Sequence, residues 1–142
     1  MESQTALITA LRDYINGIPE ELNYVFPSDL QSLLNEGEDL FILDNRTPEF
    51  YERGHIPGAV NIPLREVLYS LDKIPRDKRV VVCCWVGHTA SQLLPALTML
   101  GYKAVGLKYG MGEAKDEGDM RMGWKSLGLP TVSGSAPGEW RE

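Results

Sequence analysis

The sequence contains only two cysteines in 142 residues, and these two, Cys83 and Cys84, are adjacent. Neighbouring cysteines can hardly close an unstrained disulfide, and secreted disulfide-rich scaffolds carry more of them. A disulfide framework is therefore excluded. The two histidines, His55 and His88, do not form a zinc-binding pattern with the cysteines, so we expect no bound metal.

Long apolar runs and an excess of basic residues are also missing. No apolar stretch of 18 residues occurs, and the first 16 residues lack the basic segment and apolar run of a secretory signal. The formal net charge is −6, whereas nucleic acids and anionic membranes bind surfaces with clustered Lys and Arg. We therefore expect no nucleic-acid or membrane partner, and a cytoplasmic protein whose thiols stay reduced.

Short apolar segments alternate with helical segments along most of the chain. Strands are predicted at about 39–44, 59–62, 79–84 and 103–108, and helices at about 5–16, 26–36, 47–54, 64–75, 89–101 and 121–130. Short buried strands joined by helices indicate an α/β fold, in which a mainly parallel sheet carries helices on both faces.

The chain is expected to divide into three parts. Residues 1–22 hold an amphipathic helix that packs on the domain, followed by a linker. Residues 23–130 form the domain, and residues 131–142 form a C-terminal tail that we expect to be poorly ordered. Within the domain, Ser28 and Gln31 have the spacing of a capping box, Thr89 is a candidate helix N-cap, and Trp124 is expected in the core.

The strongest predicted strand ends at the two cysteines, and the loop CWVGHT at 84–89 joins it to a helix. Ligands of parallel sheets bind beyond the carboxyl ends of the strands. A tight strand-to-helix turn points backbone N–H groups and the positive end of the helix into one concavity, which binds anions. Gly87 permits the backbone conformation of such a turn. A thiol beside these groups is stabilised as thiolate, its nucleophilic form.

The two cysteines are expected to face opposite sides of the sheet, because side chains alternate along a strand. Cys83 continues the apolar strand and is interpreted as a small buried hydrophobe. Cys84 begins the loop and is the better candidate for a nucleophile. The alternative that both are inert core thiols stays open at this point.

Several segments resemble the single-domain rhodanese, or thiosulfate sulfurtransferase-like, family. The segment LDNRTPEFYERGHIPGAVNIP at 43–63 resembles the family's first signature, and VVVCCWVG at 80–87 resembles its strand and active loop. LKYGMG and GWKSLGLP resemble its closing segments. The resemblance covers about residues 23–130 and implies a rhodanese-like fold with a central, mainly parallel five-stranded sheet.

The resemblance also implies sulfur transfer through a persulfide on Cys84, with no metal or organic cofactor. The partners would be a small sulfur donor and a thiol or cyanide acceptor, or a protein that donates or accepts sulfur. Residues matched to the family are the nucleophile Cys84; the substrate- and anion-binding loop Trp85, Val86, Gly87, His88 and Thr89; and the supporting Asp44, Arg46, Glu49 and His55.

The sequence departs from the family pattern at Thr89. The usual loop reads Cys-x-x-Gly-x-Arg-Ser/Thr, and the arginine would give fixed charge to the sulfonate of thiosulfate. Recognition of thiosulfate is therefore expected to be weak, although His88 could supply charge when protonated. A phosphatase is disfavoured because the relatives that use this fold for phosphate need Cys-x5-Arg, and the sixth residue after Cys83 or Cys84 is Thr89 or Ala90. The alternative function is a rhodanese module without turnover that carries sulfur, senses or binds a protein.

Other positions have simpler local interpretations. Arg46 and Glu49 have the i, i+3 spacing of a local ion pair. His55 lies in a Gly/Pro-rich turn, where a hydrogen-bonded turn residue is favoured over a catalytic base. Asp44 could orient loop amides from the end of its strand, and Trp85 packs, lines the pocket or contacts a partner. Residues 112–121 form an acidic insertion, expected as a loop or helix near the site.

Overall fold

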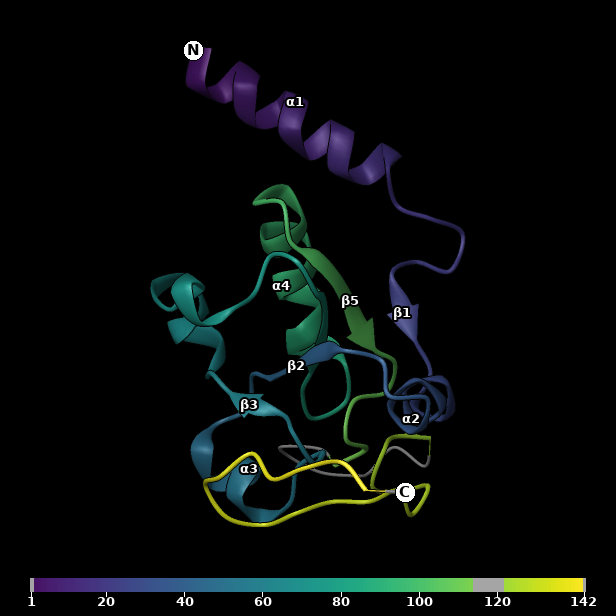
Figure 1. The fold of residues 1–142 in the computed structure, drawn as a ribbon. Helices are drawn as coiled ribbons and strands as arrows, with labels where there is room; N and C mark the ends of the chain where they lie inside the picture. The colour runs from purple at the N-terminus through teal and green to yellow at the C-terminus, as the bar shows by residue number, and fades with distance from the viewer. Residues whose placement is uncertain (1, 114–121, 142) are drawn as a thin grey trace.

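The computed structural model describes residues 2–113 and 122–141 and contains a five-stranded sheet (Figure 1). All neighbouring strands run parallel, in the order β1-β5-β4-β2-β3. The strands are β1 (Tyr24–Val25), β2 (Leu40–Asp44), β3 (Val60–Asn61), β4 (Arg79–Cys83) and β5 (Lys103–Leu107). The α/β prediction is confirmed. The two residues of β1 are too few to show periodicity, so this strand was not located from the sequence.

The sheet separates two apolar cores because successive side chains of a strand point to opposite faces. Val80, Val82 and Cys84 pack with the helix that follows residues 84–87, whereas Val81 and Cys83 pack on the other face. The covering helices are α2 (Pro27–Asn35), α3 (Pro48–Arg53), α4 (His88–Met99) and two 3-10 helices, η1 (Leu64–Tyr69) and η2 (Leu71–Lys73).

Several predicted helix boundaries are wrong. Helix α2 begins at Pro27 after the N-cap Phe26, so Ser28 is not its cap, because proline is favoured at the first helical position. Helix α4 has Gly87 rather than Thr89 as its N-cap. The helix predicted over 64–75 is a pair of 3-10 helices instead.

The last predicted helix, 121–130, is also wrong. Residues 122–128 form consecutive turns, and residue 121 lies outside the described residues. Trp124 is fully buried within these turns, as expected. Its indole N–H donates a 2.7 Å hydrogen bond to the carbonyl of Pro130. Backbone N–H groups of Trp124 and Lys125 also donate to the carbonyls of Gly110 and Met111, which fixes the segment to the turn after β5.

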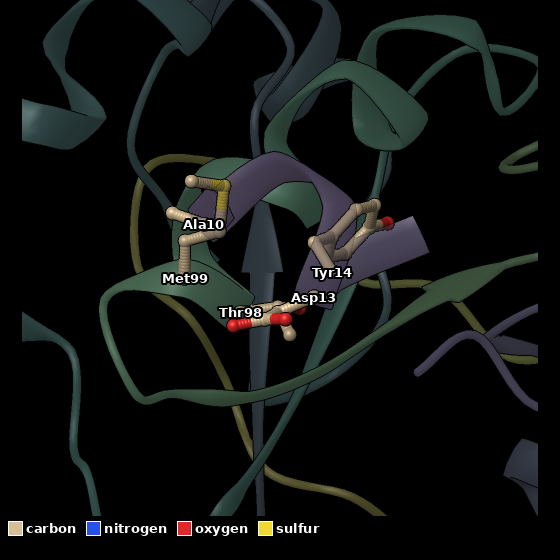
Figure 2. A pocket seen from close by; sticks show the side chains of 5 residues that line it. All are labelled: Ala10, Asp13, Tyr14, Thr98 and Met99. Carbon is tan, nitrogen blue, oxygen red and sulfur yellow. The ribbon is translucent and has the colours of Figure 1, made fainter. Parts of the chain in front are cut away.

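The N-terminal helix α1 (Glu2–Asn16) forms as predicted, but its apolar stripe does not pack on the domain. Leu7, Ile8, Leu11 and Ile15 are between 43% and 61% exposed. A different face of α1 lies beside the end of α4, where Ala10, Asp13, Tyr14, Thr98 and Met99 line an open pocket of about 350 Å³ (Figure 2). Helix α1 therefore contacts the domain at α4, as predicted, while its apolar stripe stays largely exposed.

The C-terminal tail is a packed segment, so the prediction of poor order is wrong. Val132 and His55 exchange two backbone hydrogen bonds of 2.9 Å, and the Gly58 N–H donates to the carbonyl of Pro137. Trp140 packs edge-on against Trp124, with ring centroids 5.9 Å apart. The tail runs beneath α3 and ends near α2 (Figure 1), and it completes the second core.

Candidate active site

Cys84 lies directly beyond the carboxyl end of β4, the central strand of the sheet. Its Sγ accepts hydrogen bonds from the backbone N–H groups of Gly87, at 3.0 Å, and Ala90, at 3.3 Å. Both donors belong to the turn into α4, whose N-terminal end carries partial positive charge. A sulfur atom that carries negative charge accepts such bonds better than a neutral thiol does.

The loop at 84–89, hereafter the Cys84 loop, is held in place by the segment after β5. The Met111 N–H donates to the carbonyl of Cys84 and the Gly112 N–H to that of Trp85, both at 2.9 Å. A Cβ on Gly110 would lie 2.5 Å from the Cys84 carbonyl oxygen, so this contact requires glycine. The glycine-rich turn after β5 therefore fixes the position of the Cys84 loop through these hydrogen bonds.

The turn itself depends on Gly87, which has a φ of 100°. Residues with a Cβ rarely adopt this left-handed conformation, so glycine is required where the chain turns from the loop into α4. This turn brings the Gly87 and Ala90 amides to the same sulfur atom.

Cys83 faces away from the loop and lies in the second core with Trp124 and Tyr51. Burial raises the pKa of the Cys83 thiol well above its ordinary value, and the nearby Asp44 carboxylate raises it further. The neutral thiol is therefore the stable form of Cys83. The two adjacent cysteines therefore occupy opposite faces of the sheet.

Cys84 is also 0% exposed, because Trp85, Leu93, Leu94 and other apolar residues of the first core surround it. Trp85 is 8% exposed and packs edge-on against Phe50, with ring centroids 5.6 Å apart. This places Trp85 in a packing role. Any reagent must therefore move side chains or the loop before it contacts Sγ.

Thr89 occupies the position at which the rhodanese loop usually carries arginine. Its hydroxyl donates a 3.2 Å hydrogen bond to Oδ1 of Asn45, a residue that follows β2 and is 1% exposed. The Asn45 Nδ2 group is buried and has no hydrogen-bond partner among the described residues. Asn45 was not predicted as a site residue, because a single asparagine between two charged residues carries no sequence pattern. His88 is exposed at the first position of α4, and Val86 is half-buried.

Two charged residues of the first signature, Asp44 and Arg46, form a buried ion pair at the end of β2. Arg46 forms a buried ion pair with Asp44, with 2.7 Å between Nη2 and Oδ2, and both side chains are fully buried. Arg46 also donates to the Gly54 carbonyl. Glu49 is exposed, so the predicted ion pair between Arg46 and Glu49 is wrong. Asp44, two residues before Arg46, is its partner instead. This ion pair fixes the segment that carries Asn45.

His55 is enclosed by the fold and does not face Cys84 across the loop. Its Nδ1 lies 2.9 Å from the Tyr51 carbonyl oxygen, and its Nε2 lies 3.0 Å from that of Ala136. Its ring stacks on Tyr51 with centroids 3.6 Å apart. These contacts give His55 a structural role in joining α3 to the C-terminal tail.

Part of the acidic insertion is described, and that part contacts the loop. The Glu113 N–H donates to the Trp85 carbonyl, and the Glu113 carboxylate pairs with Lys125 at 2.6 Å. The rest of the predicted acidic loop or helix, 114–121, lies outside the described residues. Within the described ranges, no three His, Cys, Asp or Glu side chains gather in a group that could hold a metal ion. Nor does any helix described by the structure have the length and apolar character to cross a membrane.

The model of the rhodanese-like domain family matches residues 26–116, and the chain belongs to this family. It is 28% identical over 113 residues to a sulfurtransferase of Allochromatium vinosum, covering 79% of this chain and 96% of that protein. It is 33% identical over 94 residues to the thiosulfate sulfurtransferase PspE of Escherichia coli, covering 65% of this chain and 78% of that protein.

Two further comparisons bear on function and fold. A Bacillus subtilis protein whose name describes a candidate sulfur carrier is 33% identical over 72 residues, which cover 51% of this chain and 39% of that protein. A rhodanese-related protein of Thermoplasma volcanium has a TM-score of 0.65 at 24% identity, covering 78% of this chain and 97% of that one. This last likeness shows the rhodanese fold.

Proposed function

We propose that the protein is a sulfurtransferase that carries sulfane sulfur as a persulfide on Cys84. One observation carries the proposal: Sγ of Cys84 accepts hydrogen bonds from the backbone N–H groups of Gly87 and Ala90 at the start of α4. Donors fixed by the backbone stabilise negative charge on sulfur and need no reorganisation during the reaction. Membership of a family with sulfurtransferase relatives supports the same chemistry.

The reaction then proceeds in two displacement steps. The Cys84 thiolate attacks the outer sulfur of a donor such as thiosulfate, the S–S bond breaks, and sulfite leaves with the bonding electron pair. A thiolate or cyanide acceptor then attacks the outer sulfur of the persulfide, and Cys84 leaves as thiolate. Both the Cys84 thiolate and the persulfide intermediate place negative charge on sulfur beside the loop amides. No oxidant or reductant is consumed in either step.

The burial of Cys84 makes the first step depend on access. Because the residue is 0% exposed, a donor must displace side chains of the first core, among them Trp85 and Phe50, before it contacts Sγ. Small donors, such as thiosulfate or inorganic polysulfide, are favoured by this arrangement. A protein donor would need to insert a persulfide side chain.

The direct test is to incubate the protein with thiosulfate or polysulfide and to locate added sulfur by mass spectrometry of peptides. We expect one sulfur adduct on Cys84, none on Cys83, and loss of thiocyanate production in Cys84→Ser. Cys83→Ala is the matched control and retains loading. Equal thiocyanate production by Cys84→Ser and the wild-type protein would refute the proposal.

A second candidate function is a sulfur carrier that accepts persulfide from a protein rather than from free thiosulfate. The observation that favours it is the Thr89–Asn45 hydrogen bond, which places neutral groups where the family loop carries a cation. A dianionic donor such as thiosulfate would lose the most binding energy when threonine replaces the family's arginine. Slow turnover of thiosulfate, together with fast loading of Cys84 from a persulfidated protein, would favour the carrier over the enzyme.

A further inference from the structure

A chain of hydrogen bonds reaches the Cys84 loop from β1, outside the residues matched by the family model. The Tyr24 hydroxyl lies 2.5 Å from Ser91 Oγ, and Ser91 Oγ donates a 2.7 Å hydrogen bond to the Gly87 carbonyl. Because a carbonyl only accepts, the single hydroxyl proton of Ser91 is used by Gly87. Tyr24 is therefore the donor to Ser91, and the hydrogen bonds run in one direction, from Tyr24 through Ser91 to Gly87.

The tyrosine reaches across β5 because β5 has a glycine at that point. Tyr24 is paired in register with Gly106. A Cβ on Gly106 would lie 3.1 Å from Cδ1 and Cε1 of the Tyr24 ring and 3.3 Å from Cδ1 of Leu94. The ring of Tyr24 thus lies against Gly106, between β5 and α4, and its hydroxyl arrives at Ser91 one turn into α4. A larger residue at Gly106 would push the hydroxyl away.

The end of this chain is the residue that contacts the sulfur. Gly87 donates its N–H to Cys84 Sγ and is the N-cap of α4, where no side chain caps the helix. Its carbonyl accepts both the backbone N–H, at 3.1 Å, and the hydroxyl of Ser91. Glycine has more backbone freedom than other residues, so the orientation of Gly87 depends on such contacts. Ser91 supplies two of them.

We propose that Tyr24 and Ser91 are positioning residues for the nucleophile. They hold Gly87 so that its N–H points at Sγ of Cys84, and they thereby favour the thiolate. This inference rests on the proposed function in one respect, that Cys84 is the reacting group. Neither side chain contacts the sulfur, so both act through Gly87.

The test measures the rate of alkylation of Cys84 by iodoacetamide as a function of pH, with the modified residue distinguished from Cys83 by the fragment ions of the peptide. Ser91→Ala is expected to lower the rate at pH 7 by about 3- to 10-fold, the effect of about one hydrogen bond, and to move the whole profile to higher pH. Tyr24→Phe keeps the ring and should lower the rate by about 2- to 3-fold in the same direction. At high pH, where the thiolate is fully formed, the variants and the wild-type protein should react at similar rates.

Two variants serve as matched controls. Ser32→Ala removes the same kind of serine-to-carbonyl bond, one turn back to Ser28 in α2. Tyr102→Phe removes a tyrosine hydroxyl that donates to the Leu71 carbonyl, away from the Cys84 loop. Neither should move the pH profile. Ser91→Thr keeps a hydroxyl and should restore most of the wild-type rate.

The result that overturns the inference is an unchanged pH profile in both Ser91→Ala and Tyr24→Phe, with circular dichroism confirming that they are folded. These residues would then be structural only. Alkylation does not require sulfur transfer, so the two proposals fail separately. A shifted profile without sulfur loading on Cys84 would leave the positioning role intact and refute the proposed function. Sulfur loading with an unshifted profile would refute the positioning role alone.

Discussion

The Thr89 hydroxyl donates to the side-chain oxygen of Asn45 over 3.2 Å, at the loop position where the rhodanese family usually has arginine. The pair joins the start of α4 to the end of β2, the strand next to β4. It leaves the Asn45 amide nitrogen buried with no partner in the described part of the chain. The Cys84 loop therefore has a hydrogen-bonded threonine at the position where the family usually has arginine.

The first prediction concerns thiosulfate recognition. Thr89→Arg should lower the Michaelis constant for thiosulfate by about 10-fold or more, because a charge-assisted hydrogen bond from guanidinium to sulfonate contributes about 1.5–3 kcal/mol. Steady-state thiocyanate production at varied thiosulfate measures it. The matched control is Gln92→Arg, exposed on α4, which should change nothing. An unchanged Michaelis constant in Thr89→Arg would show that loop charge does not limit this step.

A second prediction separates the two cysteines by stability rather than by activity. Cys83→Ala should lower the free energy of unfolding by about 1 kcal/mol, because it leaves a small cavity in the second core. Its rate of sulfur loading should stay within about 2-fold of the wild-type rate, because only the other face of β4 changes. Urea denaturation and mass-monitored loading measure the two quantities. A loss of loading at unchanged stability would assign chemistry to Cys83.

The third prediction concerns the buried pair of Asp44 and Arg46. Removal of one partner leaves an unpaired buried charge, which costs about 3–5 kcal/mol. Arg46→Met should therefore lower the free energy of unfolding by that amount in urea denaturation. The control is Lys78→Met, which breaks the exposed ion pair with Asp39 and should cost less than about 1 kcal/mol. Similar losses in both variants would contradict this assignment.

A fourth prediction follows from Tyr51. Burial, with a smaller contribution from Asp44, raises the pKa of Tyr51 from 10.0 to about 12. The folded state thus favours the neutral phenol, which donates to the Ala59 carbonyl. This stabilisation is complete below about pH 10 and is lost as the pH rises towards about 12, by up to about 2–3 kcal/mol.

The measurement is the free energy of unfolding between about pH 9 and about pH 12. Tyr51→Phe should be less stable than the wild-type protein at neutral pH, but its stability should fall less steeply in the alkaline range. Tyr69→Phe, whose tyrosine is 91% exposed, should retain the wild-type slope. If Tyr51→Phe also retains that slope, another group is responsible for alkaline unfolding.

The fifth prediction concerns the C-terminal tail. A chain that ends at Thr131 would lose the backbone pairing of Val132 with His55 and the packing of Trp140 on Trp124. With about 1 kcal/mol per hydrogen bond and a similar amount for the aromatic pair, we expect a loss of about 3–5 kcal/mol. Thermal denaturation measures it, and a chain that ends at Trp140 is the control. Equal melting temperatures in the two truncated chains would mean that the tail does not stabilise the domain.

The sheet and its active strand could be predicted because they depend on local patterns. The apolar run at 79–84 and the alternation of strands with helices led directly to β4 and to the α/β class, and strand alternation predicted the opposite orientation of Cys83 and Cys84. The helix ends were less predictable. Proline and glycine decided them at Pro27 and Gly87, where the sequence also offered the polar caps Ser28 and Thr89.

Asn45 and Tyr24, which were not predicted from the sequence, make their contacts with distant segments. Asn45 meets Thr89 across 44 positions, and Tyr24 meets Ser91 across 67. The order of the tail could not be predicted either, because Val132 pairs with a histidine 77 positions earlier. Polar residues in short irregular segments show no periodicity, so their partners become visible only when the chain is folded.

The opposite orientation of the two thiols has a consequence for oxidative damage. These are the only cysteines of the chain, and β4 directs their sulfur atoms into different cores. If Cys84 is oxidised to a sulfenic acid, the neighbouring thiol cannot resolve it as a disulfide without breaking the strand. Repair therefore requires a thiol from another molecule, small enough to enter a site in which Cys84 is fully buried. The limited access to Cys84, which restricts sulfur donors in the proposed function, would also restrict the thiols that reduce an oxidised Cys84.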